Sequence, residues 1–526
     1  MLVRESWRGI KLEQPAPETD DFSRSQIFIL FFSFVFLTTL PVWTHRLPPL
    51  SDYANHLARM QVIATLQGNV QLSRFYEVDW QIIPNLVMDL IVPTLARFMN
   101  VYLAGQIFTT GMFFLIVSGV LVLGRSLFGR WSVTALVSLP FLYNYVFLVG
   151  LMNYIFGIGI SLWGLAGWVA LREKPWLLRF AVSTVTVIVL FFSHLSALGI
   201  YGIGVLSAEL FRLWDARSNL YWGDLRGFVA SGLPFLAALP LLLASPTMNL
   251  AGSLYWDQFG KVAGLMYVIS DYSEVVGLAI LGVLLICAVW ASHHQILKLH
   301  PIALPVLIVG SLVYLALPRV MFDTYMADQR VPLGIAFILL GCTELQPRGR
   351  SLRTAFVGLL ILVLAVRLIE VDVNWSTHSE ETSQLRSSLR RIEPGSKVFV
   401  AYANSSAGED VADLGLVHAA CLAVIERSAL VTTLFTVVGK QVLHVRPEYR
   451  DFADIHDGTP PSIAQMIVAA SYPLPDMPAF WQNWPKFDYV YVLYSDDDTP
   501  NPDFSRLKLI DQGNRFQLYR VIKTAS

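Results

Sequence analysis

The chain has 526 residues, of which 55% are hydrophobic and only 15% are charged. Soluble globular proteins carry about 25% charged residues, so the composition excludes an ordinary soluble protein and indicates a polytopic membrane protein. The net charge of −1 gives no basic field that would attract nucleic acid. The three cysteines, far apart in the sequence, form neither a disulfide framework nor a CxxC metal motif.

The first apolar run covers residues 25–43 and follows a polar tail, residues 1–24. The run is too long for the apolar part of a signal peptide and lacks a small-residue cleavage site, so it predicts a retained signal-anchor helix. A helix needs about 20 apolar residues to cross a bilayer. By that measure we predict eleven spans, at 25–43, 103–124, 131–149, 152–171, 178–194, 196–212, 227–246, 275–291, 301–317, 331–345 and 354–370.

The stretch Pro48–Met60, PPLSDYANHLARM, lies just after the first span. Its Asp52, His56 and Arg59 are spaced i, i+4 and i+7, which places them on one face of a short helix. That face is expected at the membrane surface, where ionisable groups are costly unless they are paired or used. The stretch is therefore a candidate functional site. The alternative is a purely structural role, because Ser51 and Asp52 are also good residues for capping the helix that follows.

The run 82–98, IIPNLVMDLIVPTLARF, contains two prolines and two ionisable residues, so it either spans the membrane or lies on its surface. The positive-inside rule decides between these interpretations. If the run lies flat and the N-terminus is cytoplasmic, most lysines and arginines of the loops fall on the cytoplasmic side. This orientation predicts a long first outer loop, residues 44–102, with one or more interfacial helices.

The same orientation collects polar side chains at the outer rim of the bundle. A concentrated set of ionisable groups favours a site that faces outward, although outer loops can also be polar simply because they are solvated. The rim residues that we single out are Glu77, Asp79, Asn153, His194, Arg319, Asp328 and Arg330.

After residue 370 the composition becomes polar, and residues 371–526 suffice for one compact external α/β domain. The patterns predict strands at 396–401 and 487–494, a helix at 418–429 and a C-terminal hairpin that turns at 512–514. The acidic triplet 496–498 is interpreted as a solvated turn, because no spaced partner ligands accompany it. We predict neither a metal site nor a cofactor.

The topology and the motifs SDYANHLAR, YEVDW and ADQRVPL resemble the GT-C superfamily of polyprenyl-phosphate-sugar-dependent glycosyltransferases. This superfamily includes protein O-mannosyltransferases and aminoarabinose transferases, and the present chain looks most like an uncharacterised bacterial branch. The resemblance covers most of residues 25–370, the expected GT-C-like transmembrane domain. Many members place a second acid directly beside the first, whereas here Tyr53 follows Asp52.

The resemblance implies a multi-pass enzyme of the bacterial inner membrane, with a cytoplasmic N-terminus and a periplasmic C-terminal domain. Such an enzyme transfers a sugar, with inversion, from a polyprenyl-phosphate-linked donor to a glycan, lipid or protein acceptor of the cell envelope. The chemistry needs a base for the acceptor hydroxyl and positive groups for the departing phosphate. Asp52 is the candidate base, and Arg319 and Arg330 are the candidates for the phosphate, with Asp328 as a partner of Arg330.

The other candidates are assigned to substrate binding, and each has a plainer structural alternative. His56 is expected to orient Asp52 or to contact the donor phosphate. The remaining candidates are Arg59, the pair Glu77 and Asp79 beside Trp80, Asn153 and His194. The structural alternatives are a headgroup anchor for the arginines, simple surface for the pair of acids, and a hydrogen bond between helices for His194.

Two other functions compete with the enzyme. A transporter or flippase for lipid-linked glycans often shows internal repeats and broken helices near the bilayer midplane, whereas this sequence shows no convincing repeat and its polar residues sit at the rim. A non-catalytic assembly subunit for envelope polysaccharide would have the same fold as the enzyme. Only loss of the Asp52 carboxylate separates that subunit from a transferase.

Overall fold

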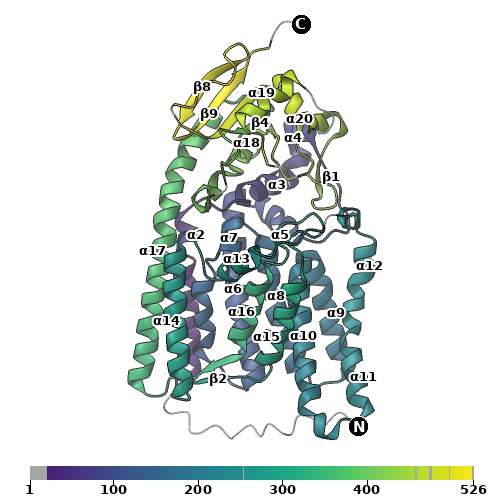
Figure 1. Cartoon of the computed structure of the whole chain (residues 1–526), viewed down its shortest axis with the longest axis vertical. Coiled ribbons are helices and arrows are strands. Elements are labelled where there is room, and N and C mark those ends of the chain that lie inside the picture. Colours follow the sequence, from purple (N-terminus) through teal and green to yellow (C-terminus); the bar gives the residue numbers. More distant parts are fainter. Residues whose placement is uncertain are drawn as a thin grey trace.

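The computed structural model describes residues 21–252, 254–408, 410–456, 459–472, 477–496 and 498–523. A bundle of helices forms the lower part of the molecule in Figure 1, and a domain that contains a sheet covers its upper end. We call residues 389–523 the C-terminal domain and the covered end of the bundle the upper end.

Seven of the described helices are long and apolar enough to cross a membrane, which makes the chain a multi-pass membrane protein. They are α6 (Val101–Phe128), α8 (Met152–Ala170), α9 (Trp176–Ser193), α10 (Leu195–Asp215), the segment Trp222–Leu243, which contains α11 (Trp222–Ser231) and α12 (Ala238–Leu243), α14 (Glu274–His293), and α17 (Arg350–Ser388), which a 3-10 turn continues to Arg391. Shorter apolar helices are α1 (Arg24–Thr38), α5 (Val87–Ala96), α15 (Ala303–Ala316) and α16 (Val331–Gly341). The predicted class, a polytopic helical bundle with a C-terminal α/β domain, is confirmed.

Several predicted spans differ in form from continuous α-helices that end where the apolar run ends, among them 131–149 and 354–370. The span 131–149 is a 3-10 stretch, η2 (Val133–Phe141), followed by α7 (Tyr145–Val149). Pro140 lies inside η2 and has no N–H to donate, so a regular α-helix is broken there. The last span does not end near residue 370, because α17 runs on to Ser388 and carries the chain into the C-terminal domain (Figure 1).

The segment 44–102 contains α2 (Leu40–Thr44) at its start, then α3 (Tyr53–Thr65), α4 (Val70–Phe75), β1 (Tyr76–Val78) and α5. The ten residues of α5 are about 15 Å long at 1.5 Å per residue. The hydrocarbon core of a bilayer is about 30 Å thick, so α5 is too short to span it. This agrees with the prediction that the run 82–98 does not cross the membrane.

The C-terminal domain is built on a five-stranded sheet of order β5-β4-β7-β9-β8. Its strands are β4 (Lys397–Tyr402), β5 (Leu430–Val431), β7 (Tyr489–Ser495), β8 (Leu507–Gly513) and β9 (Arg515–Val521). β4 is parallel to β5 and β7, and β9 is antiparallel to β7 and β8. The predicted strands and the C-terminal hairpin are confirmed. The predicted helix 418–429 is η8 (Ala419–Cys421) continued by α18 (Leu422–Arg427).

The C-terminal domain is joined to the segment 44–102 by backbone pairing. Strand β1 pairs antiparallel with β6 (Leu443–Val445), so that Glu77 lies opposite His444. Helix α3 packs between the bundle and the domain, and nine of its thirteen residues are buried. The start of α3 is therefore enclosed by parts of the chain that lie far apart in the sequence.

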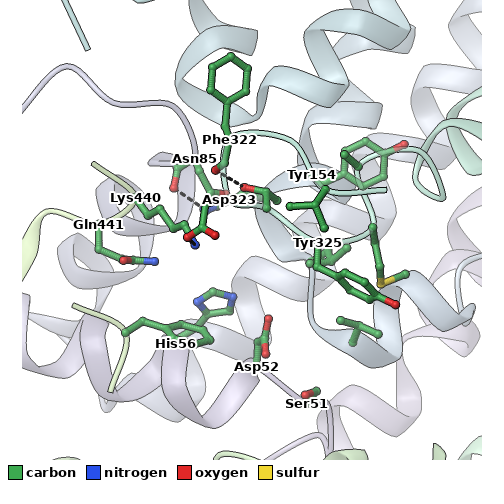
Figure 2. A pocket seen from close by; sticks show the side chains of 18 of the residues that line it. Ser51, Asp52, His56, Asn85, Tyr154, Phe322, Asp323, Tyr325, Lys440 and Gln441 are labelled. Atoms are coloured by element: carbon green, nitrogen blue, oxygen red, sulfur yellow. Dashed lines mark hydrogen bonds and ion pairs between the residues drawn. The ribbon is translucent and has the colours of Figure 1, made fainter. Parts of the chain in front are cut away.

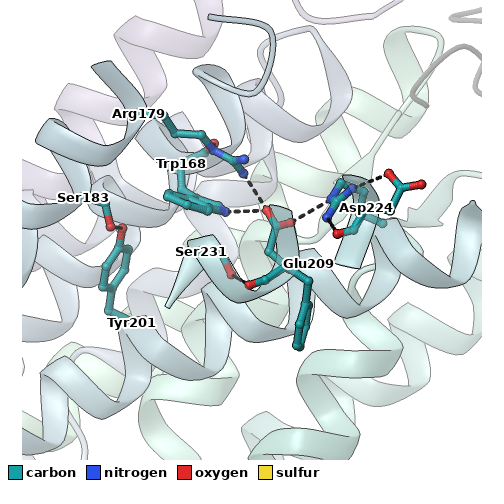
Figure 3. Close-up of polar contacts among 9 residues, drawn as sticks. Trp168, Arg179, Ser183, Tyr201, Glu209, Asp224 and Ser231 are labelled. Carbon is teal, nitrogen blue, oxygen red and sulfur yellow. Dashed lines mark hydrogen bonds and ion pairs between the residues drawn. The ribbon is translucent and has the colours of Figure 1, made fainter. Parts of the chain in front are cut away.

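A buried polar network ties helices α8 to α11 together in the lower half of the bundle (Figure 3). One oxygen of Glu209 accepts from Trp168 Nε1 at 3.1 Å and from Arg179 Nη2 at 2.8 Å. Its other oxygen accepts from Arg212 Nε at 2.8 Å, and Arg212 also pairs with Asp224 at 3.0 Å. The charges of two carboxylates and two guanidinium groups cancel, and buried charges are tolerated when they are paired in this way.

Candidate functional site

A cavity of about 720 Å³ lies between the upper end of the bundle and the C-terminal domain. Cavities of this size hold small-molecule ligands in other proteins. Its walls come from the start of α3, the junctions of α7 with α8 and of α9 with α10, the loop 320–330, and the C-terminal domain. In Figure 2 the side chains of Asp52 and His56 project into it from one side, and Asp323 and Lys440 from the other.

Asp52 occupies the N-cap position of α3, yet its side chain makes no capping hydrogen bond. The backbone N–H of Asp52 donates to Val149 O at 3.1 Å, which ties this residue to the end of α7. Gly150 has φ +91°, and a Cβ there would lie 3.0 Å from Asp52 N and Cβ. The close approach of two backbones thus directs the Asp52 carboxylate into the cavity instead of onto its own helix.

His418 of the C-terminal domain lines the cavity beside Asp52. Its Nε2 lies 3.5 Å from Asp52 Oδ1, and its Nδ1 lies 3.2 Å from Asn55 Nδ2. Asn55 also donates to Thr433 O at 2.7 Å and accepts from Phe435 N at 2.9 Å. Burial lowers the pKa of His418 to about 4, so its imidazole is neutral at physiological pH.

His56 follows Asp52 by one helical turn and lines the same cavity. Burial, with a smaller contribution from the nearby Arg59 charge, holds the pKa of His56 well below 6.5. Its ring packs edge-on against Phe435 at 5.7 Å, and its Nδ1 is buried without a hydrogen-bond partner among the described residues. His56 is thus a neutral group that lines the cavity beside the backbone of Gly150.

Arg330 brings a positive charge to the bundle side of the cavity. Its Nη2 donates to Tyr325 O at 2.9 Å, and its Nη1 lies 2.7 Å from His194 Nε2. His194 Nδ1 already accepts from Ser196 N at 3.0 Å. A neutral imidazole has only one accepting nitrogen, so the two donors exceed what His194 can accept. Arg330 Nε is also buried without a hydrogen-bond partner among the described residues.

The loop 320–330 is held in a sparsely populated backbone conformation. Phe322, Asp323 and Met326 have φ of 52°, 53° and 60°, which is uncommon for residues other than glycine. Asp323 pairs with Lys440 of the C-terminal domain at 2.9 Å, so the loop is linked across the cavity. Such strain is found where the surrounding structure imposes it, and functional sites are common among these places.

Arg319 and Asp328 do not line the cavity but anchor this loop. Arg319 Nε lies 2.9 Å from Asp328 Oδ1, and Lys261 Nζ lies 2.7 Å from Asp328 Oδ2. Arg319 also pairs with Asp257 at 3.3 Å. The sequence predicts that Asp328 pairs with Arg330, whereas in the structure it pairs with Arg319 and Lys261.

Three more sequence candidates, Arg59, Glu77 and Asp79, lie outside the cavity. A fourth, Asn153, lines the cavity, but its amide is already hydrogen-bonded to the backbone. Arg59 forms a two-fold hydrogen bond with Asp89 of α5, at 3.0 Å for each contact, with both side chains 1% exposed. Glu77 and Asp79 lie in and just after β1, next to β6. The amide of Asn153 binds the backbone of Asn85 and Met88, each at 2.8 Å.

The structure therefore brings five of the ten sequence candidates to one cavity: Asp52, His56, Asn153, His194 and Arg330. The residues that sequence reasoning missed are His418, Asn55 and Lys440. Asn55 lies inside the motif SDYANHLAR and could have been noticed there, one turn after Asp52. No local pattern marks His418 or Lys440. Among the described residues, no three His, Cys, Asp or Glu side chains are grouped so that they could hold a metal ion.

No protein-family model matches the chain, and no curated protein matches it. Among solved structures, the chain is similar to the crystal structure of ArnT from Cupriavidus metallidurans bound to undecaprenyl phosphate. The identity is 12%, the match covers 94% of this chain and 98% of that chain, and the TM-score is 0.42.

Proposed function

We propose that the chain is a membrane glycosyltransferase that moves a sugar from a polyprenyl-phosphate-linked donor to a glycan, lipid or protein acceptor of the cell envelope. The proposal is carried by one observation. A carboxylate (Asp52) and a guanidinium with unsatisfied donors (Arg330) line the same cavity at the end of a membrane-embedded bundle.

In this reaction Asp52 acts as the general base. Its carboxylate takes the proton of an acceptor hydroxyl while the acceptor oxygen forms a bond to the anomeric carbon of the sugar. The bond from that carbon to the phosphate oxygen breaks, and its electron pair stays on the polyprenyl phosphate. One displacement of this kind inverts the anomeric centre. The absence of a capping bond at Asp52 supports the assignment, because a carboxylate that served only as a cap would bind its own helix.

Arg330 stabilises the departing phosphate. A phosphate oxygen near Arg330 would accept from Nε and would relieve the excess of donors at His194. Arg330 also stands at the start of α16, whose helix dipole favours a negative charge at that end. The carboxylate of Asp52 is near enough to interact with the Arg330 charge, so base and phosphate site lie close together.

The test compares envelope glycans and lipid-linked sugars from a deletion strain that carries the wild-type gene, Asp52→Asn or the control Asp372→Asn. Asp372 lies on α17 with a side chain 56% exposed, outside the cavity. We expect Asp52→Asn, made at normal levels, to leave a glycan one sugar short while the polyprenyl-phosphate donor accumulates. If the Asp52→Asn strain gives a wild-type glycan profile, Asp52 is not the general base. The result would then favour a transporter or a non-catalytic assembly subunit.

A further inference from the structure

His418 is a residue of the C-terminal domain that is fixed from several sides. Its ring packs edge-on against Phe435 at 4.9 Å, and its backbone carbonyl accepts from Cys421 N at 3.0 Å. Its side chain is 14% exposed, and what remains open faces the cavity. The position of the imidazole is therefore set by the C-terminal domain, whereas its nearest polar partners belong to α3.

Asn55 determines which nitrogen of His418 carries the hydrogen. The amide orientation of Asn55 is fixed, because its oxygen accepts from Phe435 N and its nitrogen donates to Thr433 O. An amide NH₂ is only a donor, so its contact at 3.2 Å requires His418 Nδ1 to accept. In the neutral ring the hydrogen then sits on Nε2, the atom 3.5 Å from Asp52 Oδ1.

A neutral N–H beside a carboxylate has a specific chemical effect. Its N–H dipole, directed at a carboxylate oxygen 3.5 Å away, favours the ionised form and the present direction of the carboxylate, but it does not cancel the charge as a cation would. Because burial lowers the pKa of His418 to about 4, the ring remains such a donor over the physiological range. The other ionisable groups that line the cavity are His56, which is also neutral, and His194, Asp323, Arg330, Lys440, Asp454 and His456.

We propose that His418 is a positioning residue for the Asp52 base, so that the C-terminal domain supplies part of the catalytic site instead of only covering the bundle. The inference rests on the proposed transferase function. A structural role, in which His418 only packs the domain onto α3, would make the same contacts with Phe435 but would not act on the protonation of Asp52.

The experiment uses full-length protein in lipid nanodiscs and, as substrate, the lipid extract of the deletion strain, which holds the accumulated donor. Release of polyprenyl monophosphate is measured by mass spectrometry between pH 4.5 and 8.5. The variants are His418→Leu, which keeps bulk without a donor, and His418→Gln, whose amide N–H reaches the place of Nε2. The control is His378→Gln, a buried histidine 3.2 Å from Glu381 on α17, outside the cavity.

For His418→Leu we expect kcat to fall about ten- to a hundredfold, the factor for one hydrogen bond to a charged group, with KM for the donor nearly unchanged. The acidic limb of the pH profile should move to higher pH by about one unit, because loss of a donor to the carboxylate raises its pKa. His418→Gln should recover most of kcat and restore the limb, and the control should match the wild type.

The proposal is overturned if His418→Leu keeps the wild-type kcat and acidic limb. It is also overturned if His418→Leu and His418→Gln lose kcat equally, keep the acidic limb of the pH profile in its wild-type place and both unfold at a lower temperature. That result would show that His418 serves only to pack the domain. Failure of the transferase function looks different, because Asp52→Asn would then release as much polyprenyl monophosphate as the wild type.

Discussion

The buried pair of Arg59 and Asp89 gives a prediction that separates structure from substrate binding. Arg59 was a sequence candidate for substrate binding, but its guanidinium holds Asp89 of α5 through two contacts of 3.0 Å, with both side chains 1% exposed. Arg59→Met would leave the Asp89 carboxylate buried without its partner. Breaking a buried pair in this way costs about 3–5 kcal/mol. We therefore expect Arg59→Met to unfold at a clearly lower temperature.

Replacing both partners should cost much less than replacing one. A buried pair exchanged for apolar side chains of similar volume is often neutral or even stabilising by about 1–4 kcal/mol. The double variant Arg59→Met/Asp89→Leu should thus recover the unfolding temperature and most of the sugar transfer. Unfolding in nanodiscs can be followed by a thiol-reactive dye, because Cys342 and Cys421 are fully buried in the folded chain.

Either of two results would refute this reasoning. If Arg59→Met unfolds like the wild type and yet loses transfer, Arg59 acts in substrate binding and not in holding α5. Alternatively, the double variant could regain its stability without regaining transfer, which would show that the guanidinium is needed for more than its bond to α5.

Three further predictions concern the cavity. Gly150→Ala forces a Cβ to within 3.0 Å of Asp52 N at a φ of +91° and should lower transfer without loss of expression, whereas Gly111→Ala, with nothing within 4 Å, should be silent in the same glycan assay. Arg330→Lys keeps the charge but loses the forked donors, so kcat/KM for the lipid donor should fall. An unchanged kcat/KM would exclude Arg330 from the phosphate site. Because burial lowers the pKa of His418 from 6.5 to about 4, the unfolded chain binds more protons between these values. The free energy of unfolding should therefore fall on acidification between pH 6.5 and about 4, by at most about 1.4 kcal/mol per pH unit. His418→Gln should make this dependence on pH weaker. If the wild type and the variant lose stability equally with falling pH, the prediction is wrong.

The sequence predicts those parts of the fold that depend on local patterns. Apolar length identifies the helices, and short continuous apolar runs identify β4 and β7. The spacing of Asp52 and His56 places both on one face of α3 at the cavity. Arg59 obeys the same spacing but lies two turns from Asp52, about 10 Å along the axis at 1.5 Å per residue. That distance takes it out of the cavity and against α5, which helical periodicity alone does not reveal.

What the sequence could not predict depends on contacts between distant parts of the chain. His418 contacts Asn55, from which it is separated by 363 residues in the sequence. No pattern near either residue predicts this contact. The same holds for Lys440 and Asp323, which meet because the C-terminal domain lies over the loop 320–330. Arg319 and Arg330 look equivalent in the sequence, and only the acidic partners of Arg319 show that one anchors the loop while the other lines the cavity.

The pairing of β1 with β6 has a consequence for the order in which the protein is made. Tyr76 of β1 pairs with Val445 of β6, so the ribosome must synthesise most of the chain before β1 can form its pairing. During that time α3, whose residues are mostly buried in the finished protein, has no cover from the C-terminal domain. A chain cut after α17 would keep every membrane helix and still lack a closed cavity. The cavity of the enzyme we propose can therefore close only after the C-terminal domain has been synthesised, and shorter chains carry an open site.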